Sequence, residues 1–289
     1  MPAKTAAKER LDDLLLRLNL ASSLKEATAL VMAGRVFVNG RKSLHPSERY
    51  DSASTPEIKV SVSSAEAKYV SRGGLKLDGA LKTFGLDVKD KVCLDIGSST
   101  GGVTDVLLRN GASRVYAFDV GRNLLHEKIS SDKRVVAVEG FNFRYFSSVL
   151  KKADERYREF YQHCYEAAAS ADFAVCDVSF ISVKKILSSL SEGLDIVWFG
   201  GNSPPAKDGY FRILALVKPQ FELHPKHLKK GVVCDASLGR AAAQGIARWV
   251  KTFLKGVVVR DIIPSCIKGV SGNEEFFLLM DKSRPVSTY

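Results

Sequence analysis

The chain has 289 residues, of which 45% are hydrophobic, enough for one substantial core and a smaller second module. Its 43 Lys and Arg against 32 Asp and Glu give a formal net charge of +11, which favours a polyanionic partner such as nucleic acid. No apolar run approaches the roughly 20 residues of a membrane span or a signal-peptide core, so we expect a cytoplasmic protein without membrane association. Five cysteines without a Cys-x-x-Cys pair indicate neither disulfides nor a bound metal.

Residues 1–62 predict a small α+β module. Leucines at helical spacing after Arg10 predict a first helix, and Ser22 or Ser23 can cap a second helix that Gly34 ends. A strand at 36–38, the turn residues Asn39-Gly40 and a short strand at 58–62 complete the module, with residues 43–55 expected to form a loop.

Basic residues flank the predicted hairpin, and we expect Arg35, Arg41 and Lys42 to lie close together at one end of it, although an ordinary solvated surface stays open for them. The order of Arg10, the serine pair, Ala33-Gly34-Arg35 and Val38-Asn39-Gly40 resembles the small RNA-binding domain named after ribosomal protein S4. The resemblance implies RNA contacts for Arg10, Arg35, Arg41 and Lys42. It defines no activity, because such a domain is joined to many kinds of protein.

Residues 63–69 have the composition of a linker, and residues 70–289 alternate apolar strands with amphipathic helices. This alternation predicts a mostly parallel α/β sheet covered by helices on both faces. Strands are expected at 91–96, 114–118, 134–138, 171–176 and 211–217. Residues 145–170 predict one long helix or a helical pair, whose Lys151, Lys152, Arg156 and Arg158 either contact RNA or face solvent.

A glycine-rich loop follows the first of these strands and predicts a nucleoside-cofactor site. Asp95 stands before the loop, and Asp119, at the end of the next strand, can accept hydrogen bonds from a ribose diol. A dinucleotide site of a dehydrogenase is the alternative, but it requires Gly-x-Gly-x-x-Gly, and the Asp95 carboxylate would repel a pyrophosphate. The Asp95 carboxylate instead suits S-adenosylmethionine, whose amino and sulfonium groups are positively charged. We expect cofactor contacts from Asp95, Gly97, Ser98, Ser99, Thr100, Gly101, Gly102, Asp119, Val120 and Asn142.

Four charged residues at strand or helix ends predict a second centre on the same rim. Asp177 and Lys218 follow two strands, Lys76 lies near the start of a helix and Glu275 stands at the start of the last strand. A ribose hydroxyl is a weak acid, so its methylation needs a base near the oxygen. Our hypothesis is that Lys218 is that base and that the other three residues orient it. For any one residue alone, a surface ion pair is the alternative.

The segments around these residues, among them residues 69–77, 177–182 and 217–222, resemble the TlyA (hemolysin A) family, which joins an S4-type domain to an FtsJ-like ribosomal RNA methyltransferase. The resemblance implies a Rossmann-like domain with a seven-stranded sheet and S-adenosylmethionine-dependent methylation of the 2′-oxygen of cytidines in small- or large-subunit ribosomal RNA. It also implies a catalytic tetrad of Lys76, Asp177, Lys218 and Glu275, and we expect Arg72 in the first segment to contact RNA. Residues 145–170 and 198–210 look like insertions.

Other functions are weaker predictions. Ser203-Pro204-Pro205-Ala206 is similar to a motif of enzymes that methylate base amino groups, but Ala206 lacks the aromatic ring that stacks on a base. A non-catalytic RNA-binding or ribosome-assembly factor is the main alternative. A membrane-active hemolysin is supported by no amphipathic membrane helix. The sequence leaves open the target nucleotide and the oligomeric state.

Overall fold

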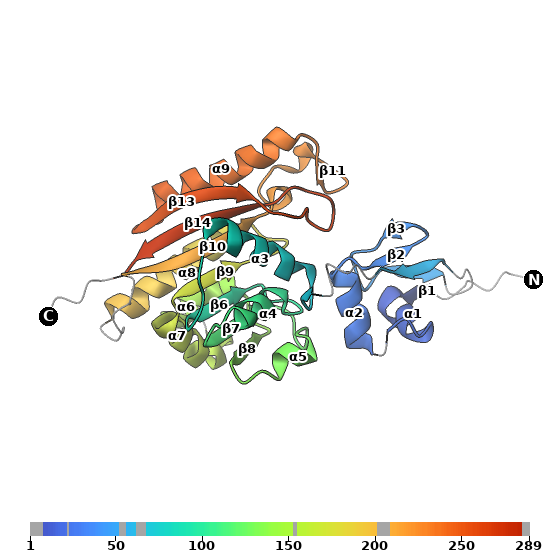
Figure 1. Cartoon of the computed structure of the whole chain (residues 1–289), viewed down its shortest axis with the longest axis horizontal. Helices are drawn as coiled ribbons and strands as arrows, with labels where there is room; N and C mark the ends of the chain where they lie inside the picture. The colour runs from blue at the N-terminus through green and yellow to red at the C-terminus, as the bar shows by residue number, and fades with distance from the viewer. Residues whose placement is uncertain are drawn as a thin grey trace, which may run out of the picture. The chain divides into compact units, whose positions relative to one another are not determined.

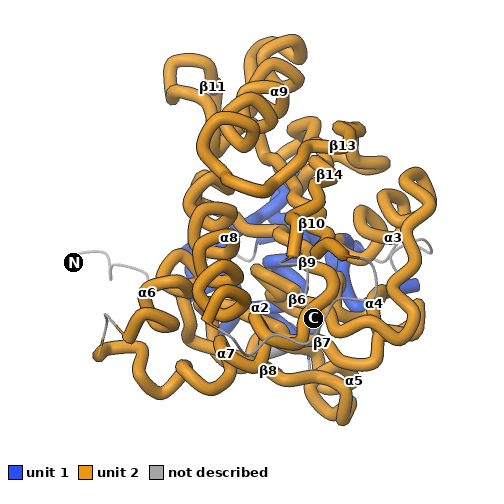
Figure 2. The backbone as a smooth tube through the Cα atoms, turned by 90° about the vertical axis from the view of Figure 1, so that its left-hand side faces the viewer, with its two compact units in different colours: residues 1–72 blue, residues 73–289 orange. Residues whose placement is uncertain are grey.

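The computed structural model of the chain describes residues 8–21, 23–51, 56–61, 68–152, 155–200 and 209–284. The chain divides into two compact units, residues 1–72 and residues 73–289, which Figure 2 colours separately. Within the described ranges, no helix combines the length and the apolar character needed to cross a bilayer.

The first unit packs two helices against short strands. Leu11, Leu15 and Val31 of the helices bury against Val36 and Val38 of a strand. The unit has a three-stranded sheet in the order β3-β2-β5 and a two-stranded ribbon of β1 and β4. Its elements are β1 (Lys8–Arg10), α1 (Leu11–Arg17), α2 (Leu24–Met32), β2 (Val36–Val38), β3 (Arg41–Lys42), β4 (Arg49–Asp51) and β5 (Ile58–Val60).

Local signals in the sequence explain most of these elements. The Ser23 side chain caps α2 by accepting a hydrogen bond from the Glu26 amide at 3.1 Å. Asn39 and Gly40 have φ values of 49° and 73°, the left-handed pair of a tight hairpin turn. The prediction of a loop over residues 43–55 is wrong at Arg49–Asp51, which forms β4 and pairs with β1.

The second unit is built on a seven-stranded sheet in the order β13-β14-β10-β9-β6-β7-β8. Strand β14 runs antiparallel to both of its neighbours, and the strands from β10 to β8 run parallel to one another. The predicted mostly parallel seven-stranded sheet is thus confirmed. The strands are β6 (Val92–Ile96), β7 (Arg114–Asp119), β8 (Val135–Glu139), β9 (Phe173–Cys176), β10 (Tyr210–Val217), β13 (Val257–Pro264) and β14 (Phe276–Ser283).

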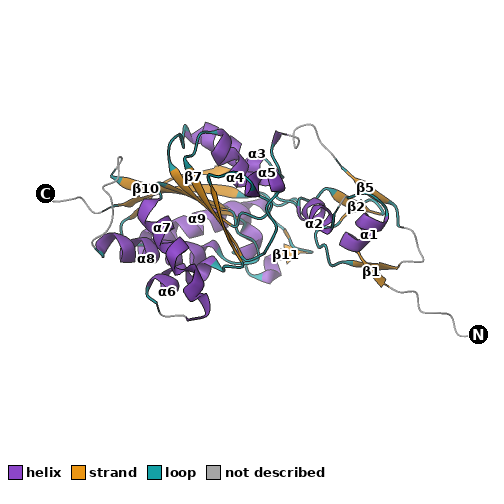
Figure 3. Cartoon of the chain, turned by 90° about the horizontal axis from the view of Figure 1, so that it is seen from below, coloured by secondary structure: helices purple, strands orange, loops and turns teal. Residues whose placement is uncertain are grey.

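Helices cover both faces of this sheet, as predicted. Figures 1 and 3 show α3, α4 and α5 on one side and α6, α7, α8 and α9 on the other. The helices are α3 (Arg72–Phe84), α4 (Gly102–Arg109), α5 (Glu127–Ser130), α6 (Phe146–Leu150), α7 (Tyr161–Ser170), α8 (Val183–Phe199) and α9 (Ala236–Phe253). A large buried cluster joins the second group of helices to the sheet, including Phe118, Phe146, Leu190 and Ile246.

Two of the predicted irregular regions take definite forms. Residues 145–170 contain α6, a 3₁₀ segment η3 (Glu155–Phe160) and α7, so the alternative of one long helix is wrong and the helical pair is closer. Trp198 was expected in an insertion but lies inside α8, buried, with its indole N–H donating to the Ala168 carbonyl at 3.1 Å. The motif at residues 203–206 lies outside the described residues.

Candidate active site

The reversal of β14 brings Lys218 and Glu275 to the same rim of the sheet. Val217, the last residue of β10, pairs with Phe276, the first residue of β14, so the residues just beyond them are neighbours. On the other side, β10 runs parallel to β9, and Asp177 follows the end of β9. The carboxyl ends of two parallel strands and the start of one reversed strand therefore meet at one place.

Lys218 is held by two oxygen atoms. Its ammonium nitrogen lies 2.7 Å from Oδ1 of Asp177 and donates to the Ser179 hydroxyl at 2.8 Å. Burial by itself raises the pKa of Asp177, but the positive charges of Lys218 and Lys76 outweigh it and hold that pKa below its ordinary value. Asp177 thus stays an anion between two lysines.

Lys76 and Glu275 form a buried ion pair, with Nζ donating to Oε2 at 2.6 Å. Lys76 is 8% exposed in α3 and Glu275 is 3% exposed. Gly269 packs directly against the Glu275 carboxylate, and a side chain at Gly269 would overlap it. Removal of the Lys76 ammonium leaves the Glu275 carboxylate buried without this partner, which costs about 3–5 kcal/mol. The pair fixes Lys76 beside Asp177, on whose charge it acts.

The glycine-rich loop after β6 lies against the same centre. Gly97, Ser99 and Gly101 have positive φ values of 91°, 47° and 92°. A Cβ atom at Gly97 would lie 2.6 Å from the backbone oxygen of Asp177, so glycine is required both by conformation and by space. The loop turns into α4, whose first residue Gly102 is buried, and Ser98 and Thr100 are buried as well.

Two carboxylates border this loop. Asp119 accepts hydrogen bonds from the amides of Ser99 at 2.7 Å and Gly121 at 2.8 Å, which fix it at the end of β7. Asp95 is fully buried and accepts from the Thr104 hydroxyl at 2.6 Å, while its second oxygen has no hydrogen-bond partner within the described part of the chain. Burial chiefly, together with the charges of Asp177 and Asp119, raises the pKa of Asp95 to about 7 despite the Thr104 hydrogen bond.

These features fit S-adenosylmethionine. A buried carboxylate oxygen without a partner suits a cationic group of a ligand, and the Asp119 oxygens retain lone pairs for hydroxyl donors. Val120, next to Asp119, is an exposed apolar residue at 66%. Asn142 uses its side chain to cap the 3₁₀ segment η2 (Phe143–Tyr145) by accepting from the Arg144 amide. Within the described ranges, no group of His, Cys, Asp and Glu could hold a metal ion.

Phe180 is a residue of this site that the sequence analysis missed. Its side chain is 80% exposed, its φ is 63°, and its ring lies 5.3 Å from that of Phe221, centroid to centroid. It follows Ser179, the hydrogen-bond partner of Lys218. The sequence did contain a signal for it, because Phe180 is a large aromatic residue that directly follows polar strand-end residues and belongs to no apolar pattern.

The residues predicted to contact RNA are only partly grouped. Arg41 pairs with Val38 and Lys42 with Phe37 beside the tight turn. Arg35 stands before the opposite end of β2 and donates to the Ser61 carbonyl, so the predicted single corner is instead spread along the strand. Arg10 forms hydrogen bonds of 2.9 and 2.6 Å with the Asp12 carboxylate. Arg72 is the first residue of α3.

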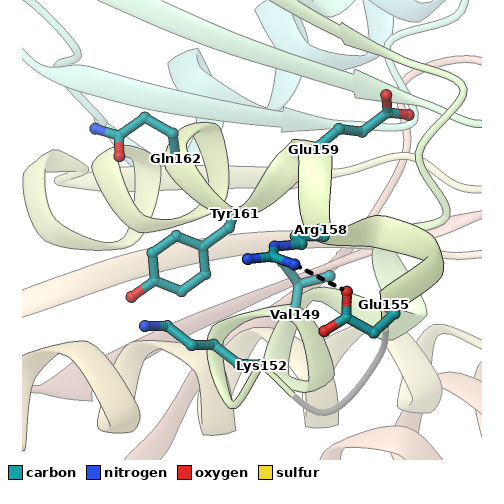
Figure 4. A pocket seen from close by; sticks show the side chains of 7 residues that line it. All are labelled: Val149, Lys152, Glu155, Arg158, Glu159, Tyr161 and Gln162. Atoms are coloured by element: carbon teal, nitrogen blue, oxygen red, sulfur yellow. Dashed lines mark hydrogen bonds and ion pairs between the residues drawn. The ribbon is translucent and has the colours of Figure 1, made fainter.

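A hollow of 370 Å³ lies between the end of α6 and the start of α7, and none of the predicted catalytic residues lines it. Figure 4 shows the Glu155–Arg158 ion pair across it and Lys152 directed toward the ring of Tyr161. Because it mixes acidic and basic side chains and includes none of the four charged residues of the rim, we assign it no part in the chemistry.

A parallel sheet with one reversed strand, a glycine loop beside Asp119 and a charged rim define a Rossmann-like methyltransferase. The chain belongs to the FtsJ-like methyltransferase family, which matches residues 69–282, and an S4 domain matches residues 9–53.

Relatives cover nearly the whole chain. YqxC of Bacillus subtilis, named as a candidate rRNA methyltransferase, is 39% identical over 95% of this chain and 86% of its own length. TlyA of Mycobacterium tuberculosis, named as a 16S/23S rRNA (cytidine-2′-O)-methyltransferase, is 34% identical over 94% of this chain and 90% of its own length. A solved structure described as a candidate hemolysin from Streptococcus thermophilus is 35% identical, covers 96% of this chain and 90% of its own, and has a TM-score of 0.62. The predicted resemblance to the TlyA family and the methyltransferase class are confirmed.

Proposed function

We propose that the chain transfers a methyl group from S-adenosylmethionine to a ribose 2′-hydroxyl of ribosomal RNA, with cytidine as the target nucleoside. The observation that carries this proposal is the convergence of two lysine–carboxylate pairs, Lys218–Asp177 and Lys76–Glu275, at the end of the glycine loop. Hydroxyl methylation requires a positioned proton acceptor, and the rim supplies one.

The cofactor is assigned to the loop after β6. Asp95 and residues 97–102 would hold its charged end, and Asp119, Val120 and Asn142 its nucleoside end. When bound, S-adenosylmethionine supplies an electrophilic methyl group on a positively charged sulfur atom. Asp95 and Asp119 contribute negative charge and hydrogen-bond acceptors, in keeping with a ligand that carries positive groups and a ribose diol.

Lys218 is assigned the role of general base. Nζ of Lys218 would take up the proton that the 2′-hydroxyl loses, and the ribose oxygen would take the methyl group that bound S-adenosylmethionine supplies. Asp177 and Ser179 hold Nζ in place, since both lie within 2.8 Å of it. Such a base contributes about 10²- to 10⁴-fold to a rate.

Lys76 and Glu275 are assigned to orientation. Their buried pair keeps a positive charge next to Asp177, and this charge acts together with that of Lys218 to lower the pKa of the Asp177 carboxyl. Glu275 in turn holds the Lys76 amine, at 2.6 Å.

The RNA substrate is supported by the S4 domain, by the net charge of +11 and by the names of relatives such as TlyA. We assign RNA binding to residues 1–62, with Arg10, Arg35, Arg41 and Lys42, and we propose Arg72, the first residue of α3, as a further RNA contact. Residues 63–69 are the proposed linker and residues 70–289 the proposed transfer domain, acting in the cytoplasm on ribosomal RNA or ribosomal subunits.

The test is incorporation of a tritiated methyl group from S-adenosylmethionine into transcripts of small- and large-subunit ribosomal RNA. The label should resist alkaline cleavage of the adjacent phosphodiester, because a methylated 2′-oxygen cannot attack it. Lys218→Ala is expected to lower the rate about 10²- to 10⁴-fold and to keep cofactor affinity. Lys185→Ala, which removes an exposed lysine in the first turn of α8, is the matched control.

Label on a base, or full activity of Lys218→Ala, would remove the proposed base from the mechanism. RNA binding without any methyl transfer would favour the non-catalytic factor. Leakage of liposomes caused by the purified protein would favour the hemolysin.

A further inference from the structure

A second basic surface lies in the transfer domain, on a segment that we call the basic hairpin, residues 225–233. It consists of the 3₁₀ turn η5 (Pro225–His227) and the strands β11 (Leu228–Lys229) and β12 (Val232–Val233). Lys226, Lys229 and Lys230 are all exposed on it. Among the residues that the structure describes, none of these three side chains forms an ion pair. The three charges are therefore available to an external anion.

The tip of the basic hairpin is a two-residue turn with a lysine in it. Lys229 pairs with Val232, which leaves Lys230 and Gly231 as the turn, with φ values of 51° and 78°. Glycine and asparagine adopt this conformation most readily, and other residues do so at a cost of about 1–2 kcal/mol. A lysine at this point places a positive charge at the tip of the hairpin but lowers stability. Residues held in an unfavourable backbone conformation are often found at functional sites.

The basic hairpin is fastened to the catalytic rim. Asn273 is buried, accepts a hydrogen bond from the Val233 amide at 2.8 Å and donates one to the Gly231 carbonyl at 2.9 Å. Asn273 stands two positions before Glu275, and a cavity of 230 Å³ between this segment and the hairpin is lined by Val232, Lys268 and Asn273, among others. The backbone of the basic hairpin is thus held to the segment that leads into Glu275.

We propose that the basic hairpin binds phosphates of the RNA backbone next to the target nucleotide, as an RNA contact of the transfer domain that is additional to the S4 domain. This inference rests on the proposed function for the identity of the polyanion. Lysines act on phosphates as point charges, and each phosphate neutralised releases condensed counterions. A hairpin joined by Asn273 to the segment that leads into Glu275 would hold the RNA backbone next to the proposed site.

The experiment compares two charge-matched variants of the full chain. The first combines Lys226→Gln, Lys229→Gln and Lys230→Gln. The second combines Arg248→Gln, Lys251→Gln and Lys255→Gln. Arg248 and Lys251 are exposed in the last turns of α9, about 18 Å or more along that helix from its start beside the hairpin, and Lys255 is exposed just after the end of α9. Both lose three positive charges, so a difference between them reports position and not net charge.

Binding to transcribed fragments of ribosomal RNA is measured from 50 to 200 mM salt. Every chain also carries Lys218→Ala, so that the measurement reports RNA binding alone and does not depend on methyl transfer. Three phosphate contacts account for a slope of about 2–3 in log Kd against log salt. Over this range the parent chain is therefore expected to lose about 20- to 40-fold more affinity than the hairpin variant. The α9 variant should keep the parent slope to within one, and thermal melting should show that all three chains are folded.

Equal losses in the two variants would overturn the proposal, because they would show a general effect of charge. So would a hairpin variant with the parent slope. Loss of binding to vesicles of anionic lipid, with RNA binding unchanged, would assign the lysines to a membrane surface instead and would also overturn it. A failure of methyl transfer in the unmodified chain affects the proposed function and leaves this binding comparison intact.

Discussion

The Glu222 carboxylate accepts a hydrogen bond from the Ser182 hydroxyl at 2.6 Å and a second from the adjoining Val183 amide at 2.7 Å. Ser182 also caps α8. Glu222 ends the turn that begins at Lys218, and Ser182 ends the segment that begins at Asp177. The contact therefore fastens together the two segments that carry the proposed base and its carboxylate.

Glu222→Ala is expected to lower the free energy of unfolding by about 1–3 kcal/mol, because it leaves partly buried donors without an acceptor. The rate of methyl transfer should fall about tenfold or more with little change in cofactor affinity, since a misplacement of about 1 Å costs roughly 100-fold. Glu222→Gln should restore much of the rate because it keeps one acceptor oxygen. The control is Glu192→Ala, which removes a half-exposed carboxylate of α8 that forms an ion pair with Lys151. A wild-type rate in Glu222→Ala would show that the contact is not needed.

The raised pKa of Asp95, about 7, predicts how stability depends on pH. The folded protein holds this proton more tightly than the unfolded chain, so the contribution of Asp95 to stability is complete below about pH 4 and is lost as the pH rises through 7. The stability of Asp95→Asn relative to the parent should therefore rise with pH, by at most roughly 4 kcal/mol in total once the pH is above 7, and the variant should bind S-adenosylmethionine more weakly. Urea unfolding from pH 4.5 to 8.5 measures the difference. A gap that stays constant over that range would contradict the prediction.

Gly97→Ala and Gly85→Ala separate conformational strain from steric overlap. Both glycines have positive φ values, 91° and 62°, but a Cβ at Gly85 meets nothing within 4 Å, whereas at Gly97 it meets the Asp177 backbone oxygen at 2.6 Å. Gly85→Ala should cost about 1–2 kcal/mol. Gly97→Ala should cost about 1–3 kcal/mol more and should also weaken cofactor binding, since the loop must move. Chemical denaturation measures the free energy of unfolding of both variants. If the two variants lost the same amount, the glycine loop would be shown to accommodate a side chain at Gly97 without strain.

Phe180 is expected to support the target base by stacking. Phe180→Ala should weaken RNA binding or raise KM by about 5- to 100-fold, the range for loss of one base–aromatic contact, whereas Phe180→Tyr should retain it. Stability should not fall, because the ring is 80% exposed. Phe253→Ala, which removes another exposed aromatic ring at the end of α9, serves as the control in the same RNA-binding measurement. Equal effects of the two alanine variants would exclude a specific role for Phe180.

The sequence predicted the transfer domain well because strand alternation specifies which ends of strands share a rim. Asp177 and Lys218 could be placed together on that ground alone. Glu275 was placed on the same rim, as a residue at the start of the last strand, although no local pattern in the sequence shows that β14 is reversed. Phe180 escaped notice because exposure of an aromatic ring is decided by the turn around it.

The remaining errors have similar causes. Strands β1 and β4 are three residues long and largely charged, so they carry no apolar alternation to detect. The grouping of Arg35 with Arg41 failed because the turn signal gives the position of the hairpin but not which side chains end up at its tip. Trp198 was assigned to an insertion because the Gly and Pro residues after it indicated that the preceding helix ends before it. Its indole in fact packs within the core.

The partner of Lys76 is synthesised 199 positions after it, because β14 returns against the other strands. A nascent chain that terminates before Glu275 would lack both β14 and the carboxylate that lies 2.6 Å from the Lys76 amine, so this rim of the sheet could not be completed. Incomplete translation products are thus expected to stay open and to be degraded by proteases instead of accumulating as inactive competitors for RNA.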